Sequence, residues 1–417
     1  MEVVIVGAGI GGLTLALQLH KAGIPSRVYE AAPEIKPVGV GVTLLPHCVK
    51  ALGELGLVDA LGKLAVATRE TVFFNRFGQK IHSELTGRHA GYEWSQFQVH
   101  RADILQVLVD AFKARVGEDR LFLGWKCTGF AQDAKAATAK FVSTVSGEAL
   151  ASQNGDVLVG CDGINSVIRK QLHPAEGAPV YSGVNMWRGV TRWQPFLSGA
   201  SMTRAGWLAT GKLVVYPIRN NIDAEGRQLV NWVCELETPD YKRRDWNRPG
   251  NIGDFIGHFA DWHFDWLDVP AFLRAADVIL EFPMVDQDPL PRWSHGRVTL
   301  LGDAAHPMVP RGSNGAGQAI LDARALADSL ARHADPAAAL QTYQDLRLEA
   351  TAKVVRMNRS NPPDAILREA WLRTGDKPFT RIEDVISIDE LRALSDGYKR
   401  VTGSDMEALS APTTAAT

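Results

Sequence analysis

The chain has 417 residues, of which 46% are hydrophobic and 22% charged, an ordinary globular composition and a length that favours two domains. Its 45 basic and 47 acidic side chains give a formal net charge of −2, and this near neutrality argues against broad nucleic-acid binding. The scattered cysteines exclude a C-x-x-C dithiol centre and a zinc knuckle, and the lack of a basic leader or of an apolar run of membrane-spanning length favours a cytoplasmic protein.

The first segment predicts a strand, a glycine-rich turn, a helix and a second strand. The run "EVVIV" is typical of a buried parallel strand, and the second run, "SRVYE", ends at Glu30. Between them, "GAGIGG" contains G-x-G-x-x-G at Gly7, Gly9 and Gly12, with Gly11 inside the motif. Glu30 lies 18 residues after Gly12 (30 − 12). This context predicts a dinucleotide site rather than a turn without a ligand, because the glycines let a pyrophosphate approach the helix and the carboxylate accepts hydrogen bonds from ribose hydroxyls.

The pattern changes twice further along the chain. A glycine-rich loop, "VGVGV", and a helix occupy residues 31–67; "TVFFNRFGQKIHSEL" then predicts a hairpin, and "RADILQVLVDAFKARVG" predicts a helix. Residues 177–281 show long strands without a helical period, which indicates a mainly antiparallel sheet. From Arg297 the strand-then-helix pattern returns, a capped helix starts near Ser387, and "GSDMEALSAPTTAAT" predicts a disordered tail.

These elements predict the fold class. We expect an α/β protein with a Rossmann-like nucleotide-binding domain, a mainly antiparallel β-sheet domain and a C-terminal helical segment. Two further aspartates follow buried strands, Asp162 in "VLVGCDGINSVIRK" and Asp303 in "TLLGDAAHPMVPRGSNGAGQAI". Taken alone, each predicts an ordinary turn. The helix after Asp303 is expected to begin near Ser313 or Asn314, since both residue types are favoured N-caps.

The three motifs together are far more specific than any one of them. In chain order, G-x-G-x-x-G, "DG" with Arg169 behind it, and "GDAAHPMVP-x-G-x-NG" resemble the FAD-dependent aromatic-ring hydroxylases, which are single-component flavoprotein monooxygenases. The resemblance covers about residues 1–360, and stretches such as "MWRGVT" and "LVNWVC" resemble a phenazine hydroxylase of pyocyanin synthesis. It implies an FAD-binding domain formed by residues 1–67, 98–176 and 282–360, a substrate-binding sheet domain formed by residues 68–97 and 177–281, and a C-terminal helical segment with a disordered tail in residues 361–417.

The resemblance also implies which residues hold FAD. Asp303 would contact the ribityl chain and pyrophosphate region, and Asp162 the FAD and nicotinamide region. Arg101, in "VHRADIL", would contact FAD near the pyrophosphate; the alternative is a solvated charge at the start of a helix. The helix after Asp303 would point its free N–H groups at the pyrimidine edge of the flavin ring. The cofactor-binding residues expected in this way are Gly7, Gly9, Gly11, Gly12, Glu30, Gly41, Val42, Arg101, Asp162, Asp303, Gly312 and Gly315, with Gly39 beside them.

Three side chains are candidates for catalysis: His306, Tyr216 and His47. For His306 we favour a flavin-positioning or structural role over proton transfer. His47, in "LLPHCVK", either faces the substrate or is a hydrogen-bonded histidine at the start of a helix. Tyr216 is favoured over Arg188 and Trp232 because Pro217 follows it and stiffens the strand end. The strand alternation leaves open which face of the predicted sheet meets the flavin.

Three further features allow alternative interpretations. "HFADWHFDW" offers His258, Asp261, His263 and Asp265, but the aromatic residues between them favour a packed amphipathic segment, so we expect no metal. Arg311 beside the flavin loop either attracts an acidic substrate or is solvated. The apolar positions Ile388, Leu391, Leu394 and Tyr398 form one helix face, which either covers the pocket or docks a partner subunit.

The resemblance implies an FAD-dependent monooxygenase that uses NADH or NADPH and O2. Oxygen transfer from a flavin 4a-hydroperoxide would hydroxylate an aromatic or N-heteroaromatic, acidic small molecule, with decarboxylation as a variant outcome. The alternatives are a flavin-dependent reductase or oxidase that is not coupled to hydroxylation, and a flavin-holding protein without catalysis. We expect a monomer or homodimer whose partners include neither nucleic acid nor a membrane.

Overall fold

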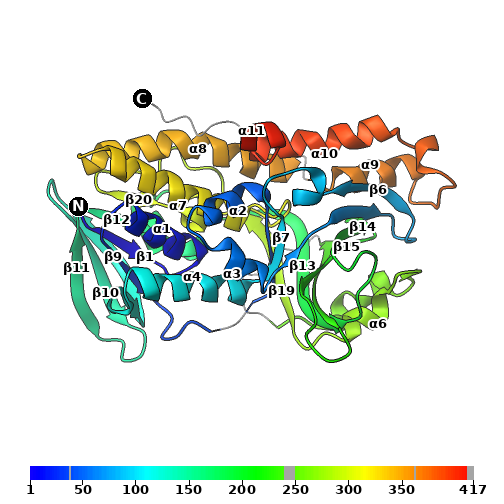
Figure 1. The fold of residues 1–417 in the computed structure, drawn as a ribbon, viewed down its shortest axis with the longest axis horizontal. Coiled ribbons are helices and arrows are strands. Elements are labelled where there is room, and N and C mark those ends of the chain that lie inside the picture. Colours follow the sequence, from blue (N-terminus) through cyan, green and yellow to red (C-terminus); the bar gives the residue numbers. More distant parts are fainter. Residues whose placement is uncertain (37–38, 239–248, 361–362, 411–417) are drawn as a thin grey trace.

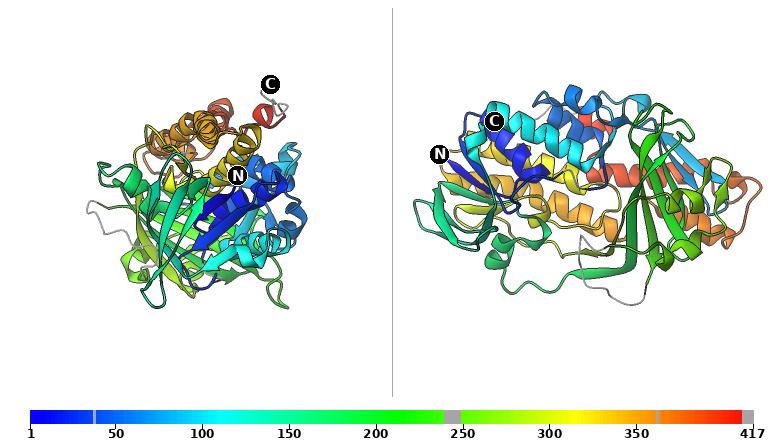
Figure 2. Two further views of the ribbon diagram at one scale, coloured as in Figure 1. Left: turned by 90° about the vertical axis from the view of Figure 1, so that its left-hand side faces the viewer. Right: turned by 90° about the horizontal axis from the view of Figure 1, so that it is seen from below.

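The computed structural model describes residues 1–36, 39–238, 249–360 and 363–410. Two sheet-containing parts lie end to end along the long axis; the long helix α8 (Pro336–Ser360) runs over the first part and α10 (Ile388–Thr402) over the second (Figure 1). Seen from below, the strands of the larger sheet stand at one end and the N-terminal elements lie at the other (Figure 2). The predicted α/β class, with a parallel sheet, an antiparallel-rich sheet and C-terminal helices, is confirmed.

The N-terminal part is built on a parallel sheet. Its strand order is β20-β12-β1-β2-β8, and each neighbouring pair is parallel. The runs read from the sequence as buried strands are β1 and β2, and every residue of β1 is buried. The strands are β1 (Val3–Val6), β2 (Ser26–Glu30), β8 (Leu121–Leu123), β12 (Val157–Gly160) and β20 (Val298–Leu300).

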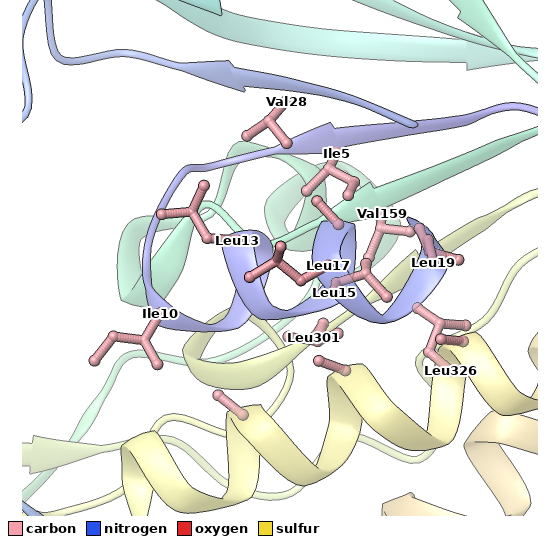
Figure 3. Packing of buried hydrophobic residues seen from close by; sticks show 14 of the residues in the cluster. Ile5, Ile10, Leu13, Leu15, Leu17, Leu19, Val28, Val159, Leu301 and Leu326 are labelled. Carbon is pink, nitrogen blue, oxygen red and sulfur yellow. The ribbon is translucent and has the colours of Figure 1, made fainter. Parts of the chain in front are cut away.

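Helix α1 (Ile10–Lys21) holds this sheet to α7 (Gly315–Arg332). Figure 3 shows its leucines directed partly at Ile5 and Val159 of the sheet and partly at α7, where Leu326 lies. Each fully buried aliphatic side chain of this kind contributes roughly 1.5–3 kcal/mol. The packing therefore fixes the N-termini of α1 and α7, which both lie at the carboxyl edge of the sheet. Around this core lie α4 (Arg101–Arg115), α5 (Val167–Leu172) and an antiparallel sheet of β9 (Trp125–Gln132), β10 (Ala137–Ser143) and β11 (Ala149–Gly155).

The second part is the predicted antiparallel-rich sheet, with strand order β19-β13-β16-β15-β14-β5-β6. The predicted hairpin is its edge pair β5–β6, and β5 joins the sheet by parallel pairing with β14. Strand β19 crosses the domain boundary predicted at residue 282, because it pairs with β13 throughout. The strands are β5 (Glu70–Phe74), β6 (Lys80–Leu85), β13 (Val180–Trp193), β14 (Ser201–Trp207), β15 (Gly211–Arg219), β16 (Gln228–Glu237) and β19 (Ile279–Asp286).

A small sheet joins the two parts. Strand β7 (Phe97–His100) pairs with β3 (Gly41–Leu44) and β4 (Val66–Ala67), so the predicted boundary at residues 97–98 falls inside β7. The loop predicted from "VGVGV" is only partly irregular, because Gly41 already begins β3; Pro37 and Val38 beside it lie outside the described residues. Helices α2 (Pro46–Gly53) and α3 (Val58–Gly62) follow β3.

The segment read as a possible metal site packs as an aromatic cluster. Phe259, Trp262 and Phe264 are buried on one face of the large sheet, together with Phe272 of α6 (Val269–Arg274). The short strands β17 (His263–Phe264) and β18 (Leu267–Asp268) form a hairpin there. This arrangement agrees with the packed amphipathic segment that we expected.

The C-terminal segment is helical, as predicted. α9 (Ala365–Thr374) precedes α10, and Ser387 and Glu390 form a capping box at the start of α10. The tail predicted to be disordered begins instead with a short helix, α11 (Met406–Ser410), and residues 411–417 lie outside the described chain. In the part of the chain that the structure describes, no helix combines the length and apolarity that a membrane crossing requires.

Candidate active site

The glycine-rich turn lies between β1 and α1. Gly7 has a φ of +108°, and a Cβ there would lie 2.3 Å from the carbonyl oxygen of Cys161. A Cβ on Gly12 would lie 2.0 Å from the carbonyl oxygen of Gly7. By contrast, a Cβ on Gly9 would meet no described atom within 4 Å, so space is open in front of α1. Helix α1, which is described throughout, has neither a side-chain N-cap nor an acidic residue in its first turn, and such a helix end suits phosphate oxygens.

Gly11 differs from the other glycines of the turn. A Cβ there would lie 2.8 Å from Leu301 Cδ2 and 3.4 Å from Ala319 Cβ, so this position is set by the packing of α1 against α7. Its expected contact with the cofactor stays a prediction.

Glu30 ends β2 beside the same turn. Its carboxylate accepts hydrogen bonds from the backbone N–H groups of Ala8 and Ala32, each at 2.8 Å. A carboxylate offers about four acceptor positions, so positions remain for ribose hydroxyls. The open space at Gly9, the uncapped first turn of α1 and this acceptor together fit the adenosine and pyrophosphate part of FAD.

The two aspartate motifs meet at the carboxyl edge of the parallel sheet. Asp162 follows β12, and its carboxylate accepts hydrogen bonds from Ser166 Oγ at 2.6 Å and from Val167 N at 2.8 Å at the start of α5. Asp303 follows β20 with an exposed side chain, and a Cβ on Gly315 would lie 3.8 Å from its Oδ1. Asp303 therefore lies beside the N-terminus of α7, where the resemblance places the ribityl chain.

Arg169 ties the two motifs together, a role that the sequence did not predict. Its buried guanidinium donates to the carbonyl oxygens of Ala304 at 2.9 Å and Ala305 at 2.8 Å, while Nε donates to Glu176 at 2.8 Å. These bonds fix the backbone just after Asp303. Spacing alone could not show this, because the two partners are 135 and 136 residues away along the chain.

His306 belongs to a buried ion cluster. Its Nε2 lies 2.5 Å from Asp322 Oδ2, and Asp322 also accepts from Arg347 Nε at 2.7 Å and from Gly302 N at 3.2 Å. Burial raises the pKa of Asp322, but His306 and Arg347 lower it by more, so this carboxylate is ionised at neutral pH. The cluster anchors the loop after β20 to α7 and α8, which supports the positioning role over proton transfer.

Strand β3 lies against the large sheet at Tyr216. Gly41 N donates to Asn231 Oδ1 at 2.7 Å, and Arg188 Nη2 donates to Gly41 O at 2.9 Å. A Cβ on Gly41 would lie 2.7 Å from Tyr216 Cε2, so only glycine fits between β3 and the tyrosine. Burial raises the pKa of Tyr216, and nearby arginines oppose this only in part, so the phenol stays protonated.

These contacts settle which face of the sheet meets β3. Tyr216 and Arg188 lie on it, whereas Trp232 packs with Trp187 in the aromatic cluster on the opposite face and donates to Thr191 Oγ1 at 3.0 Å. Trp232 is therefore a core residue. Val42 follows Gly41 in β3 and is half-buried.

Arg101 also lies beside this strand. It begins α4 directly after β7, and its N–H donates to Val40 O at 3.0 Å. Gly39 has a φ of +142°, and a Cβ there would lie 3.1 Å from Arg101 Cβ, while the arginine side chain is exposed. The structure thus brings together Gly39, Gly41 and Arg101, as the resemblance implies.

A cleft of about 740 Å³, open to solvent, lies where the two parts meet. Its walls come from β3 and α2, from β5, β6 and β14 of the large sheet, from the loop before α7 and from α10. Its lining combines apolar side chains with a few polar and charged ones, as is usual for sites that bind small molecules. The side chains and backbone that line it include Thr43, Leu45, Pro46, Phe73, Glu84, Met202, Arg204, Gly312, Ser313, Tyr398 and Lys399.

Tyr398 of α10 connects the cleft to the loop before α7. Gly312 has a φ of +85°, and a Cβ there would lie 1.7 Å from the Tyr398 hydroxyl. The hydroxyl accepts from Asn314 Nδ2 at 3.0 Å and donates to Asn358 Oδ1 at 2.7 Å. Asn314 is the N-cap of α7 by position, as predicted, but its side chain makes no capping bond because its amide binds Tyr398 and Gly312 instead. Helix α10 therefore covers the pocket.

Comparison with known proteins agrees with this arrangement. A family model described as an FAD binding domain matches residues 1–201 and 282–358. The chain is 40% identical to phenazine 1,6-dicarboxylic acid hydroxylase PhzS of Lysobacter antibioticus over 364 residues, which cover 86% of this chain and 89% of the relative. This chain belongs to the FAD-dependent aromatic-ring hydroxylases.

Another relative and two solved structures match most of the chain at lower sequence identity. 6-Hydroxynicotinate 3-monooxygenase of Bordetella bronchiseptica is 29% identical, over 90% of this chain and 93% of that protein. HpxO of Klebsiella pneumoniae in complex with FAD and uric acid has a TM-score of 0.75 at 24% identity, covering 97% of each chain. A salicylate hydroxylase substrate complex has a TM-score of 0.73 at 22% identity, covering 98% of this chain and 96% of that chain. The two structures show that the fold is shared.

His47 of this aromatic-ring hydroxylase is buried at the start of α2. Neither ring nitrogen has a hydrogen-bond partner among the described residues, so the expectation of a hydrogen-bonded histidine is wrong. The ring lies against the first turn of α7, since a Cβ on Gly317 would lie 3.3 Å from His47 Nε2. Burial, with Arg347 adding to it, lowers the pKa of His47 to about 4. The imidazole is therefore neutral at pH 7.

This pKa makes a testable contribution to stability. Below pH 6.5 His47 becomes protonated in the unfolded chain but stays neutral in the folded hydroxylase. The free energy of unfolding therefore decreases as the pH falls from about 6.5 to about 4, by roughly 3 kcal/mol in total. His47→Gln should remove that part of the pH dependence, measured as the free energy of unfolding in urea at both ends of the range. His258→Gln, at an exposed histidine, is the control. An unchanged pH dependence in H47Q would contradict the assignment.

Proposed function

We propose that this protein is an FAD-dependent monooxygenase that uses NAD(P)H and O2 to hydroxylate an aromatic or N-heteroaromatic acid, with or without decarboxylation. The observation that carries the proposal is the cleft, because the loop residues Gly312 and Ser313 line it together with apolar side chains such as Phe73 and Met202. An aromatic ring in the cleft would thus lie against the loop that is expected to border the flavin. The activities of the relatives on a phenazine dicarboxylate and on hydroxynicotinate support this substrate class.

The residues of this chain have distinct tasks in such a reaction. Bound FAD would supply hydride acceptance from NAD(P)H and the activation of O2. The N-terminus of α7 would stabilise negative charge on the cofactor by roughly 0.3–2 kcal/mol. Phe73 and Met202 would exclude water from the substrate, and Tyr398 would hold the loop before α7 in place. The ion cluster of His306 and Asp322 would keep the same loop rigid from the other side.

The remaining assignments are the compartment and the assembly. We propose a cytoplasmic monomer or homodimer. Cys48, Cys127, Cys161 and Cys234 are all unpaired, which supports a reducing compartment. Size-exclusion chromatography with light scattering would decide between the two oligomeric states.

The test is anaerobic reduction of the purified FAD-loaded protein. Mixing with NADH and then with NADPH should bleach the flavin slowly, and one member of a panel of aromatic and N-heteroaromatic acids should speed the bleaching many-fold. That compound should then yield a hydroxylated product in aerobic turnover, in proportion to the O2 consumed. Equal reduction rates with and without every aromatic, together with H2O2 as the sole oxygen product, would favour a reductase or oxidase instead.

A further inference from the structure

A cluster of buried charges lies behind one wall of the cleft. Lys212 Nζ binds Glu235 Oε1 at 2.8 Å and also forms an ion pair with Asp364. Asp364 pairs in addition with Arg204, and Arg311 Nε lies 3.4 Å from Glu235 Oε2. None of the five side chains is more than 9% exposed. The large sheet, the loop before α7 and the start of α9 all contribute to this cluster, which we call the charge cluster.

The charge cluster carries an unbalanced positive charge. Among the described residues it pairs three cations with two carboxylates. Burial raises the pKa of Asp364, but Lys212 and Arg204 lower it by more, so this carboxylate is ionised at neutral pH. A buried charge without a counter-charge is costly, so binding of one further anion beside the cluster would be favourable.

Two buried donors in the cluster are unused. Arg204 Nε and Arg311 Nη2 have no hydrogen-bond partner among the described residues. Buried donors of this kind are nearly always satisfied, and a planar guanidinium matches a carboxylate well. Of the two arginines, Arg204 lines the cleft, next to Met202.

The other charged side chains that the structure describes at the cleft do not carry an unbalanced positive charge that could bind an anion. Lys399 and Glu84 both line it, but they bind each other at 2.7 Å, so that pair is already neutral. The unbalanced charge at the cleft is therefore that of Arg204 and the side chains behind it.

We propose that Arg204 binds a single carboxylate of the aromatic substrate, and that the rest of the charge cluster holds this arginine in place. This inference rests on the proposed function and adds the residue that recognises the acid group: Arg204 should select the carboxylate form of the substrate over the corresponding amides and neutral phenols. The rival is that the unbalanced charge serves the reduced cofactor, since Arg311 precedes Gly312 of the loop before α7.

The test compares acids with their amides on the FAD-loaded protein. The probes are phenazine-1-carboxylate and benzoate, each against its carboxamide, and the dissociation constants come from titration calorimetry. In the wild-type protein at least one acid should bind about 10–100-fold more tightly than its amide. Arg204→Gln should abolish that preference with little effect on amide binding, whereas Arg204→Lys should keep part of it because it keeps the charge.

Controls separate binding from folding. Arg219→Gln changes a half-exposed arginine on the neighbouring strand and should leave the preference intact. If Arg204→Gln does not fold, Arg204→Gln with Asp364→Asn removes both members of one ion pair and should give the same loss of preference. FAD content and thermal unfolding report the integrity of each variant.

Three results would overturn the proposal. The first is that acids bind the wild-type protein no more tightly than their amides, or do not bind at all. The second is that the preference for acids survives in the Arg204→Gln variant. The third is that the sole change in that variant is a shift of the flavin reduction potential, which would assign the charge to the cofactor. An aromatic that still speeds flavin reduction in any of these cases would leave the proposed function standing.

Discussion

Replacing Asp364 with alanine should lower the free energy of unfolding by about 3–5 kcal/mol. Asp364 is 1% exposed and is paired with both Arg204 and Lys212, so its removal leaves the three buried cations of the charge cluster with the single carboxylate of Glu235. The stabilisation that Asp364 provides also depends on pH, because its pKa is lower in the folded than in the unfolded protein. Its contribution to the free energy of unfolding is complete above the unfolded pKa of about 3.9 and is lost as the pH falls below that value.

Urea unfolding followed by circular dichroism measures this loss at pH 7. Glu349→Ala is the matched control, because Glu349 and its partner Arg356 are each 57% exposed and such pairs contribute about 1 kcal/mol or less. A loss within 1 kcal/mol for D364A would show that the buried cations find other partners, and the net charge assigned to the charge cluster would then be wrong.

The second large effect is expected in the glycine-rich turn, where Gly12→Ala should weaken FAD binding by about 10–100-fold. The added Cβ would lie 2.0 Å from the carbonyl oxygen of Gly7, a residue that directly follows β1 and whose N–H donates to Tyr29 O at 2.7 Å. Overpacking of this kind costs about 1–3 kcal/mol, which corresponds to that range of affinity. The turn would have to move away from the position that brings the helix N-terminus to the pyrophosphate.

Titration of FAD into the apoprotein, followed by quenching of flavin fluorescence, gives the dissociation constants. Gly257→Ala is the control, because a Cβ there meets no described atom within 4 Å and the residue lies in the short 3-10 helix Ile256–Phe259 next to the aromatic cluster. Gly9→Ala should separate the role of the motif in folding from its role in cofactor binding, because its Cβ enters the open space in front of α1. The apoprotein should fold normally but bind FAD more weakly than the wild-type protein. FAD binding by G12A at the wild-type affinity would mean that the turn tolerates the shift.

Local patterns were enough to predict the framework of the protein. Each strand of the parallel sheet is a short apolar run, and the glycine spacing with Glu30 marks the first turn, so β1, α1 and β2 follow from neighbouring residues alone. The capping box at Ser387 predicted α10 for the same reason. The antiparallel meander of β9, β10 and β11 was not predicted, because its exposed face carries a mixed polar pattern with little alternation.

The candidate site depends on contacts that no local pattern can report. Arg204 and Lys212 occur in strands where a basic residue usually faces solvent, and their partner Asp364 lies 160 and 152 residues away along the chain. Tyr398 and Asn314 are likewise 84 residues apart. Side chains of this kind acquire their roles only when two parts of the chain pack together, so the sequence predicts the motif residues and misses those that close the cleft.

The order of strands in the parallel sheet has a consequence for biosynthesis. Strand β20 pairs with β12, yet β13 to β16 and β19 of the large sheet are translated between them. A ribosome that adds about 5–20 residues per second needs roughly 7–28 s to go from Gly160, the end of β12, to Val298, and during that time this edge of β12 has no neighbour. The intervening strands are thus free to form their own sheet on the ribosome, whereas Asp303 and Gly312 are added only after all of these strands. The two halves of the predicted nucleotide site are therefore both present only once residue 312 has been added, and a chain truncated before β20 would hold the first half without the second.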